Sequence, residues 1–218
     1  MKLATLAYEI ARDAIENPSG FNFEGFVRGD YDNDRDYSSQ ISFAFNYINL
    51  FFARLLTERK TKLKIAKAVS DANGYIEFPD GKVTAVVDAV SPHYQNVRFF
   101  EYLNGIALEK KWVSKVVSIE YRPLIPHFSL EDIRKLSTDA ENDAMYEEVV
   151  INLEDYGITD EMCAYVKEFA KGGLMEYLSP ELSEKHAQKA EGYLNRLPVQ
   201  HTQFPQREIK NVMEGDWL

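Results

Sequence analysis

Hydrophobic positions near the start of the chain recur with the period of an amphipathic helix. Over residues 2–16 these positions are Leu3, Leu6, Ala7, Ile10, Ala11 and Ala14. A second set follows Ser38 or Ser39, either of which can cap a helix, and comprises Ile41, Phe45, Ile48, Phe52 and Leu55. Spacings of three and four residues give a helix one buried face. The pattern therefore predicts an N-terminal part, 1–60, with two helices joined by a polar loop at 17–38.

From Thr61 onward the hydrophobic period changes to two. Leu63 and Ile65 alternate with Lys62 and Lys64, and the next apolar runs are short and separated by turn sequences such as "DANG" and "PDG". Asn104-Gly105 is the strongest hairpin signal, because a type I′ turn needs a positive φ at both central positions. Residues 61–122 are therefore predicted to form an inserted antiparallel β module of five or six strands.

The stretch "YRPLIPHF" at 121–128 joins the β module to the last third of the chain. Pro123 and Pro126 each remove a backbone donor and restrict the residue before them, so regular structure is expected to stop here. Ser129 with Asp132 three residues later is typical of a helix start. We expect the helical period to return from this serine, first in an acidic segment, 129–150, whose boundaries the pattern leaves open.

Two further helices are predicted closer to the C-terminus. One starts at Thr159, with a stripe of Met162, Tyr165, Val166 and Phe169. The other starts at Ser179, with a stripe of Leu182, Ala187, Ala190, Tyr193, Leu194 and Leu197. Residues 123–197 would complete the helical body, and 198–218 would form a tail. The predicted fold class is α+β, mainly an α-helical bundle with an inserted small antiparallel β module.

Composition favours a folded protein and argues against membrane insertion. The chain has 218 residues, 45% of them hydrophobic, which is enough for a sizeable core. Its most apolar stretch, 42–56, is too short for a bilayer and is interrupted by Asn46, Asn49 and Arg54. The first residues do not resemble a secretion signal. We expect a soluble, unexported protein with no membrane partner.

Charge is divided along the chain. The net charge of −10 argues against a protein that reads nucleic acid by neutralising phosphates. Residues 54–67 nevertheless carry six basic side chains against Glu58, a net of +5, whereas 131–161 carry eleven acids against Arg134 and Lys135, a net of −9. The chain therefore has a basic and an acidic pole in sequence.

No pattern in the sequence predicts catalytic chemistry or a cofactor. Asp30, Asp32, Asp34 and Asp36 alternate like the first ligands of an EF-hand, but Arg35 and Ile41 stand where that loop needs Gly and Glu, so a solvated loop is favoured over a metal site. The four histidines lack metal-ligand spacing. Cys163, the single cysteine, excludes an internal disulfide and is interpreted as a buried structural thiol.

Other polar and small residues also have structural interpretations. His186 is expected to be a surface or packing residue, and Gly172-Gly173 is expected to allow close helix packing or a kink. On a helix the adjacent Glu147 and Glu148 would point about 100° apart, too far to act as an acid–base pair.

The order of these parts resembles the head-to-tail connector, or adaptor, proteins of tailed bacteriophages. The resemblance covers about residues 39–213 and rests on "YIEFPDGKVTAVVDAV", on "VVSIEYRP" running into a proline link, and above all on "YGITDEMCAYVKEFAKGGLMEYLSPELSEKHAQKAEGYLNRL". The H-x-x-x-A-E-x-Y pattern near its end is similar to adaptor rings of short-tailed phages such as the crAss-like group. Residues 17–38 have no counterpart in this pattern.

The resemblance implies a structural virion protein. Such proteins form homo-oligomeric rings, commonly of twelve subunits, in the neck between the portal protein and the tail, and DNA passes through their channel without sequence-specific binding. The virion would be assembled in the host cytoplasm. Other phage tail or baseplate components, or a plain interaction protein, remain the main alternatives. An enzyme with a dispersed active site is a further one, which a deep pocket holding His127 with acids would favour.

A ring leads to three expectations about contacts. The basic residues Arg59, Lys60, Lys62 and Lys64 would face acids of the 131–161 segment on the neighbouring subunit. Alternatively the acids Asp139, Glu141, Asp143, Glu147 and Glu148 would line the channel, where they would avoid gripping DNA. The apolar tail residues Phe204, Ile209, Val212 and Trp217 would dock on an adjoining subunit. Both charged sets also have a simpler interpretation as solvated faces.

Overall fold

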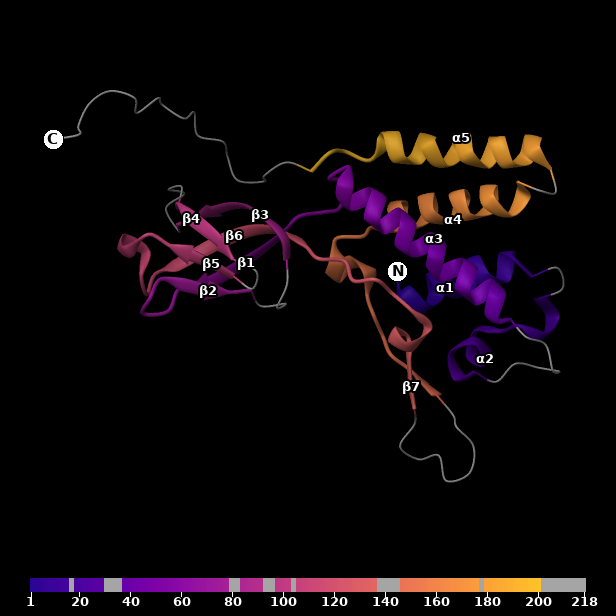
Figure 1. Cartoon of the computed structure of the whole chain (residues 1–218), viewed down its shortest axis with the longest axis horizontal. Coiled ribbons are helices and arrows are strands. Elements are labelled where there is room, and N and C mark those ends of the chain that lie inside the picture. Colours follow the sequence, from indigo (N-terminus) through magenta and orange to yellow (C-terminus); the bar gives the residue numbers. More distant parts are fainter. Residues whose placement is uncertain are drawn as a thin grey trace. The chain divides into compact units, whose positions relative to one another are not determined.

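The protein folds into a helical unit and a β unit, and the fold class is α+β (Figure 1). The computed structural model describes residues 1–15, 18–29, 37–78, 83–91, 97–102, 105–136, 146–176 and 179–200. Met1–Lys62 and Ile125–Val199 form the helical unit, and Leu63–Leu124 form the β unit, for which the sequence predicted 61–122. The chain thus leaves the helical unit, builds the β unit and returns.

The helical unit is built on five α-helices, with short 3-10 helices and one hairpin, among the residues described. The α-helices are α1 (Leu3–Asp13), α2 (Phe23–Arg28), α3 (Ser38–Thr57), α4 (Asp160–Met175) and α5 (Pro180–Arg196). The 3-10 helices are η1 (Pro18–Gly20), η3 (Leu130–Asp132) and η4 (Leu153–Tyr156), and the hairpin strands are β7 (Arg134–Leu136) and β8 (Tyr146–Glu148). Among the helices that the structure describes, none is long and apolar enough to cross a membrane.

The apolar stripes of α1 and α3 form the centre of the helical core, as their period predicted. All five predicted positions of α3 are buried, and Ala44 and Phe51 widen its buried face. Asn22 and Thr159 accept hydrogen bonds from the first turns of α2 and α4, which fixes where these helices begin. Helix α5 uses only part of its predicted stripe, because Ala190, Leu194 and Leu197 are buried while Leu182 is exposed.

Two predictions for the helical unit were wrong. The segment 17–38 was predicted to be a loop but contains α2, whose Phe26 and Val27 are buried in the core. The return to helix at Ser129 does not occur either. Ser129 and Asp132 do form a capping box, but only a 3-10 helix follows, and the chain then enters β7 and β8. A local cap signal sets the first turn, while the pairing between these strands sets the structure after it.

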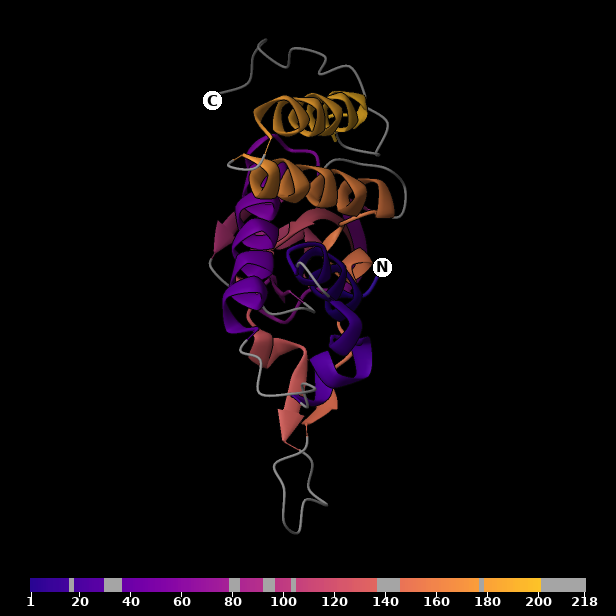
Figure 2. The same cartoon turned by 90° about the vertical axis from the view of Figure 1, so that its right-hand side faces the viewer.

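Helices α4 and α5 lie side by side in both views (Figures 1 and 2). The two adjacent glycines of α4 permit this packing, as expected. A Cβ on Gly172 would touch the backbone of Ser183 and Ala187 in α5, at 3.4 and 3.5 Å. A Cβ on Gly173 would overlap the hydroxyl of Tyr47 in α3. The double glycine therefore fits α4 between two neighbouring helices.

The β unit is a small sandwich of two three-stranded antiparallel sheets. The β6 sheet has the order β1 (Lys64–Val69), β6 (Val116–Pro123), β3 (Val83–Val90), and the β5 sheet has the order β2 (Tyr75–Glu77), β5 (Gly105–Leu108), β4 (Phe99–Tyr102). A short 3-10 helix, η2 (Lys110–Trp112), joins β5 to β6. Val117, Ile119 and Tyr121 of β6 share one core with Ile76, Ile106 and Leu108 of the β5 sheet. The six strands among the described residues of this unit agree with the predicted five or six.

The predicted hairpin is present, but Gly105 has a different role from the one expected. It pairs with Tyr102 inside the β4–β5 ladder and is not among the glycines with positive φ, so it is not a type I′ turn residue. A Cβ there would overlap the carbonyl of Ile76 and touch the ring of Tyr75. Strand β2 therefore packs so close to β5 at this position that only a glycine fits. Gly74, at φ +81°, does take the left-handed conformation in the "DANG" turn.

Candidate functional site

The outer face of the β5 sheet carries exposed aromatic side chains. Phe100 and Tyr102 of the edge strand β4 are 69% and 57% exposed. The rings of Tyr102 and Tyr75 meet edge to face with centroids 6.2 Å apart, over the strand that contains Gly105. Such large apolar side chains cost free energy in water, and when clustered they mark contact surfaces. We call Tyr75, Phe100 and Tyr102 the aromatic face.

The outer face of the β6 sheet carries exposed aliphatic side chains. Ile65 and Val69 of the edge strand β1 are 48% and 60% exposed, and Val116 of β6, paired directly opposite Val69, is 44% exposed. Farther along β6, Glu120 and Arg122 are buried, so the exposed apolar side chains of β1 and β6 lie along β1 and at the start of β6. We call Ile65, Val69 and Val116 the aliphatic face.

These two faces lie on opposite sides of the β unit. Side chains alternate along a strand, and the inward set of each sheet packs into the shared core, so the outward sets point away from each other. Each face also holds one exposed charge for which the structure gives no ion pair among the described residues. This is Glu77 beside the aromatic face and Lys67 between Ile65 and Val69. The faces are unlike in shape and opposite in charge.

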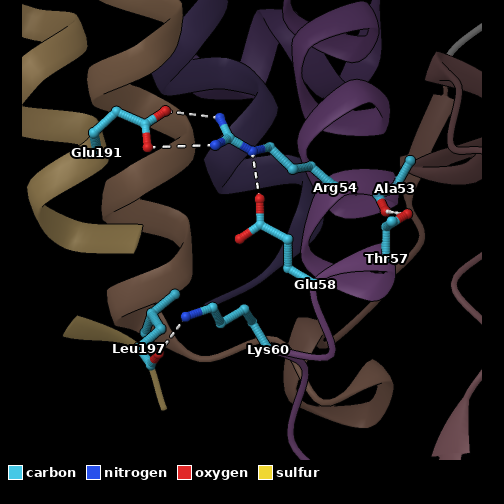
Figure 3. A network of polar contacts seen from close by, with 7 residues as sticks. All are labelled: Ala53, Arg54, Thr57, Glu58, Lys60, Glu191 and Leu197. Carbon is cyan, nitrogen blue, oxygen red and sulfur yellow. Dashed lines mark hydrogen bonds and ion pairs between the residues drawn. The ribbon is translucent and has the colours of Figure 1, made fainter. Parts of the chain in front are cut away.

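The predicted basic set divides between two environments. The ammonium group of Lys60 is used within the helical unit, where it donates to the carbonyl of Leu197 at 2.7 Å (Figure 3). Arg59 and Lys62 have exposed side chains at the end of the helical unit, and Lys64 begins β1 in the β unit. The backbone N–H of Lys62 donates to the carbonyl of Gly157 at 2.8 Å. The structure therefore leaves Arg59 and Lys62 as the exposed basic residues of the predicted set.

Arg54, next to this set, forms the main polar link between α3 and α5 (Figure 3). Its Nη1 and Nη2 donate to the two carboxylate oxygens of Glu191 at 2.8 and 3.3 Å, and its Nε donates to Glu58 at 2.8 Å. The hydrogen bonds to Glu191 and Glu58 raise the pKa of the guanidinium above its usual value, so the group stays charged. This bidentate pair and the Lys60 contact fasten α5 to the end of α3. They are structural contacts within one chain.

The acidic set is described in part. A helix was expected at Glu147 and Glu148, but both residues lie on strand β8. Their side chains therefore point to opposite faces of the hairpin. Glu148 accepts from Lys2 at 3.2 Å, and Glu147 lies 3.8 Å from Lys135. Both acids thus have cationic neighbours in their own chain. Asp139, Glu141 and Asp143 lie outside the described residues.

Several other predicted residues also lie outside the described residues. They are the four aspartates of the acidic loop, Asp30, Asp32, Asp34 and Asp36, and the four apolar residues of the tail, Phe204, Ile209, Val212 and Trp217. Within the described ranges there is no cluster of three or more histidine, cysteine or acidic side chains that could hold a metal ion.

Cys163 and His186 have the structural surroundings that were expected of them. Cys163 is buried in α4, and burial raises the pKa of its thiol to about 12. His186 of α5 lies 3.0 Å from the carboxylate of Glu168 in α4, and Lys189 donates to the same carboxylate at 2.7 Å. These polar contacts join the two helices.

A hollow in the helical unit lies between α3 and the segment after the proline joint. It has a volume of about 410 Å³, and its polar lining includes Ser42 and Asn46 of α3 together with His127, Ser129 and Arg134. No Asp or Glu is among the described residues that line it. The described lining of this hollow therefore supplies no carboxylate partner for His127.

Comparison with models of protein families finds no match, and comparison with curated proteins finds none either. Function is therefore inferred from the chain itself. The aromatic and aliphatic faces were not recognised in the sequence, although both have a signal there. In "KIAKAV" and "FFEY" apolar residues occupy both phases of the strand period, so one set must face outward.

Proposed function

We propose that this protein is a structural subunit of a homo-oligomeric ring, of the kind that head-to-tail connector proteins of tailed bacteriophages form between the portal and the tail. In this role it binds copies of itself and the ring components above and below, and DNA passes through the channel without sequence-specific contact. The protein would belong to the neck of the virion. The order of helices, β module and proline joint in the sequence, which resembles that family, supports this assignment.

The observation that carries the proposal is the pair of unlike faces on opposite sides of the β unit. A closed ring is built from heterologous contacts, in which one surface of each subunit meets a different surface of the next. The aromatic face, with Phe100 and Tyr102, is suited to pack on the aliphatic face, with Ile65 and Val69, of a neighbouring copy. Because each copy keeps its second face free, addition continues until the ring closes.

Charge gives the proposed contact a direction. Lys67 and Glu77 are exposed, each beside a different face, and neither has an ion pair with the described residues of its own chain. In a face-to-face contact between copies they provide one opposite-charge pair per interface. A contact between two aliphatic faces would bring two copies of Lys67 together, and a contact between two aromatic faces would do the same for Glu77. Both are unfavourable. The arrangement therefore favours head-to-tail addition over a symmetric dimer.

Native mass spectrometry and light scattering test the proposal, over a range of protein and salt concentrations. We expect a discrete ring of about a dozen subunits. A double substitution at the centre of the aromatic face, Phe100→Ser with Tyr102→Ser, should abolish the ring and leave a folded monomer. A chain that stays monomeric under all conditions, and also does not assemble on purified portal protein, would refute the proposal.

Charge reversal tests the direction of the contact. Lys67→Glu and Glu77→Lys should each weaken assembly at low salt, and the double exchange should restore it, because the pair is re-formed with reversed signs. Lys110→Glu is a matched control, since Lys110 is exposed on η2 and belongs to neither face. Lys62→Glu makes the same assembly test for the predicted basic set of Arg59, Lys60, Lys62 and Lys64. If the two single variants assemble like the unaltered protein, this pairing of faces is wrong even where a ring forms.

A further inference from the structure

Arg134, at the start of β7, is a half-buried cation without a hydrogen-bonded partner among the described residues. Its guanidinium stacks on the ring of Tyr146, with 4.2 Å between the guanidinium carbon and the ring centroid. Its Nε is buried and makes no hydrogen bond. A buried N–H without a partner costs free energy, and guanidinium groups in proteins are usually paired with carboxylates or phosphates.

Three described acids close to Arg134 in the chain or in the strand register are engaged elsewhere. Glu148 lies directly opposite Arg134 in the β7–β8 register, but its carboxylate accepts from Lys2. Asp132, two residues earlier, turns back to Ser129, whose backbone N–H and hydroxyl both donate to Asp132 Oδ2, at 2.6 and 2.8 Å. Glu147 points to the other face of the hairpin, near Lys135. The fold thus holds the guanidinium in place by stacking while leaving its charge unmatched by these acids.

Arg134 also lines the hollow of about 410 Å³ beside α3. The polar side chains on the opposite wall, Ser38, Ser42 and Asn46, are spaced by four residues and so follow one face of the helix. Phe45 and Phe128 supply apolar surface between the polar groups. A hollow of this size, with a cation, hydroxyl groups and an amide around apolar surface, has the features of a site for a small group with a charged end.

We propose that this hollow is a binding site for an anionic group, a carboxylate or a phosphate, attached to an apolar body. The guanidinium of Arg134 pairs with the anion, for which its planar fork of donors is suited. The hydroxyl of Ser42 and the amide of Asn46 hydrogen-bond the remaining oxygens, and Phe45 and Phe128 contact the apolar part. This site lies within the helical unit and does not depend on the proposed ring.

Ligand-observed saturation-transfer NMR tests the site in the full-length protein, whether it is a monomer or a ring. The probes are phenyl phosphate and phenylacetate, with benzyl alcohol as an uncharged probe of the same ring size, at a salt concentration of about 0.15 M. We expect saturation transfer to at least one anion and at least fivefold less to the alcohol. The stronger of the two anions then identifies phosphate or carboxylate as the preferred group.

Three variants decide whether the hollow is responsible. Arg134→Gln should reduce the anion signal at least fivefold, and Ser42→Leu should do the same by filling the hollow from an exposed helix position. Lys135→Gln, a neutralisation at the next residue, should leave the signal unchanged. Circular dichroism checks that each variant is folded. If Arg134→Gln does not fold, Ser42→Leu still tests whether the hollow binds the anion. Absence of transfer from both anions, or equal loss in the Lys135 variant, would overturn the proposal.

Discussion

Asn49 of α3 makes two hydrogen bonds with the backbone of Phe128, one in each direction. Its Oδ1 accepts from the Phe128 N–H and its Nδ2 donates to the Phe128 carbonyl, both at 2.8 Å. An asparagine side chain thus replaces the strand partner that Phe128 lacks after the chain leaves β6. The ring of Phe128 is buried against Phe52 and Tyr156. The segment after the proline joint is therefore fixed to α3 by a side chain.

Replacing Asn49 should destabilise the helical unit. Asn49→Ala leaves both backbone groups of Phe128 without their partner, which should lower the free energy of unfolding by about 1–3 kcal/mol. Asn46→Ala, three residues earlier and exposed, should change it by less than about 0.5 kcal/mol. Urea denaturation followed by circular dichroism measures both. Equal effects of the two substitutions would mean that the Asn49 contact does not fix this segment.

The glycines of α4 and α5 should respond to alanine in opposite directions. A Cβ at Gly192 meets no atom within 4 Å, so Gly192→Ala should stabilise the protein by about 0.5–1 kcal/mol through helix propensity. A Cβ at Gly173 overlaps Tyr47, whose ring is held against Phe43 and Phe51, so Gly173→Ala should destabilise by about 1–3 kcal/mol. Thermal denaturation of the two variants compares them directly. Stabilisation by Gly173→Ala would show that Tyr47 moves aside without cost.

Glu168 should make the stability of the α4–α5 pair dependent on acidic pH. Burial acts to raise the pKa of this carboxyl, but hydrogen bonds from Lys189 and His186 outweigh it and lower the pKa below 4.5. The ionised carboxylate therefore stabilises the fold fully above pH 4.5, and this contribution is lost as the pH falls through the lowered pKa.

The test of this contribution is Glu168→Gln measured at two pH values. The substitution should cost about 1–2 kcal/mol at about pH 6.5 and less at an acidic pH below the lowered pKa of the carboxyl, where the unaltered side chain is itself protonated. Glu184→Gln serves as the control, because Glu184 is exposed and its carboxylate accepts from Gln188 on the same helix. A cost that is the same at both pH values would show that the charge of Glu168 is not what matters.

Cys163 should be unreactive while the protein is folded. Burial raises the pKa of its thiol to about 12, and the thiolate is the reactive form. At about pH 8 we expect the reaction with Ellman's reagent to be at least about 100-fold slower in the native protein than in urea. Fast labelling of the native protein would mean that α4 opens readily around this residue.

Hydrophobic period alone predicted much of the architecture. The stripes of α1 and α3 and the alternation after Thr61 are local signals, because burying one face of a helix or one phase of a strand requires only the right spacing. The close packing at Gly172 and Gly173 was also expected from residue type, since small residues allow backbones to approach. These signals do not depend on which element packs where.

The hairpin of β7 and β8 was decided by tertiary contacts. Ser129 and Asp132 give a valid local cap, yet the chain becomes a strand at Arg134, because residues 134–136 pair with 146–148 and Arg134 stacks on Tyr146. Contacts between positions this far apart leave no periodic trace in a sequence. Gly105 is a similar case, since its neighbour Tyr75 belongs to a different strand much earlier in the chain.

The sequence by itself determined the fold class, the main helices and the position of the β module, because each depends on spacing within one segment. It did not determine which of its apolar residues stay exposed. Phe100 and Val69 are as hydrophobic as the core residues beside them, and only the packing of the two sheets onto one shared core decides which phase of each strand faces inward. The charges of Lys67, Glu77 and Arg134, unpaired within the described part of the chain, are likewise a property of the folded protein, because a charge is unmatched only once the positions of its neighbours are set.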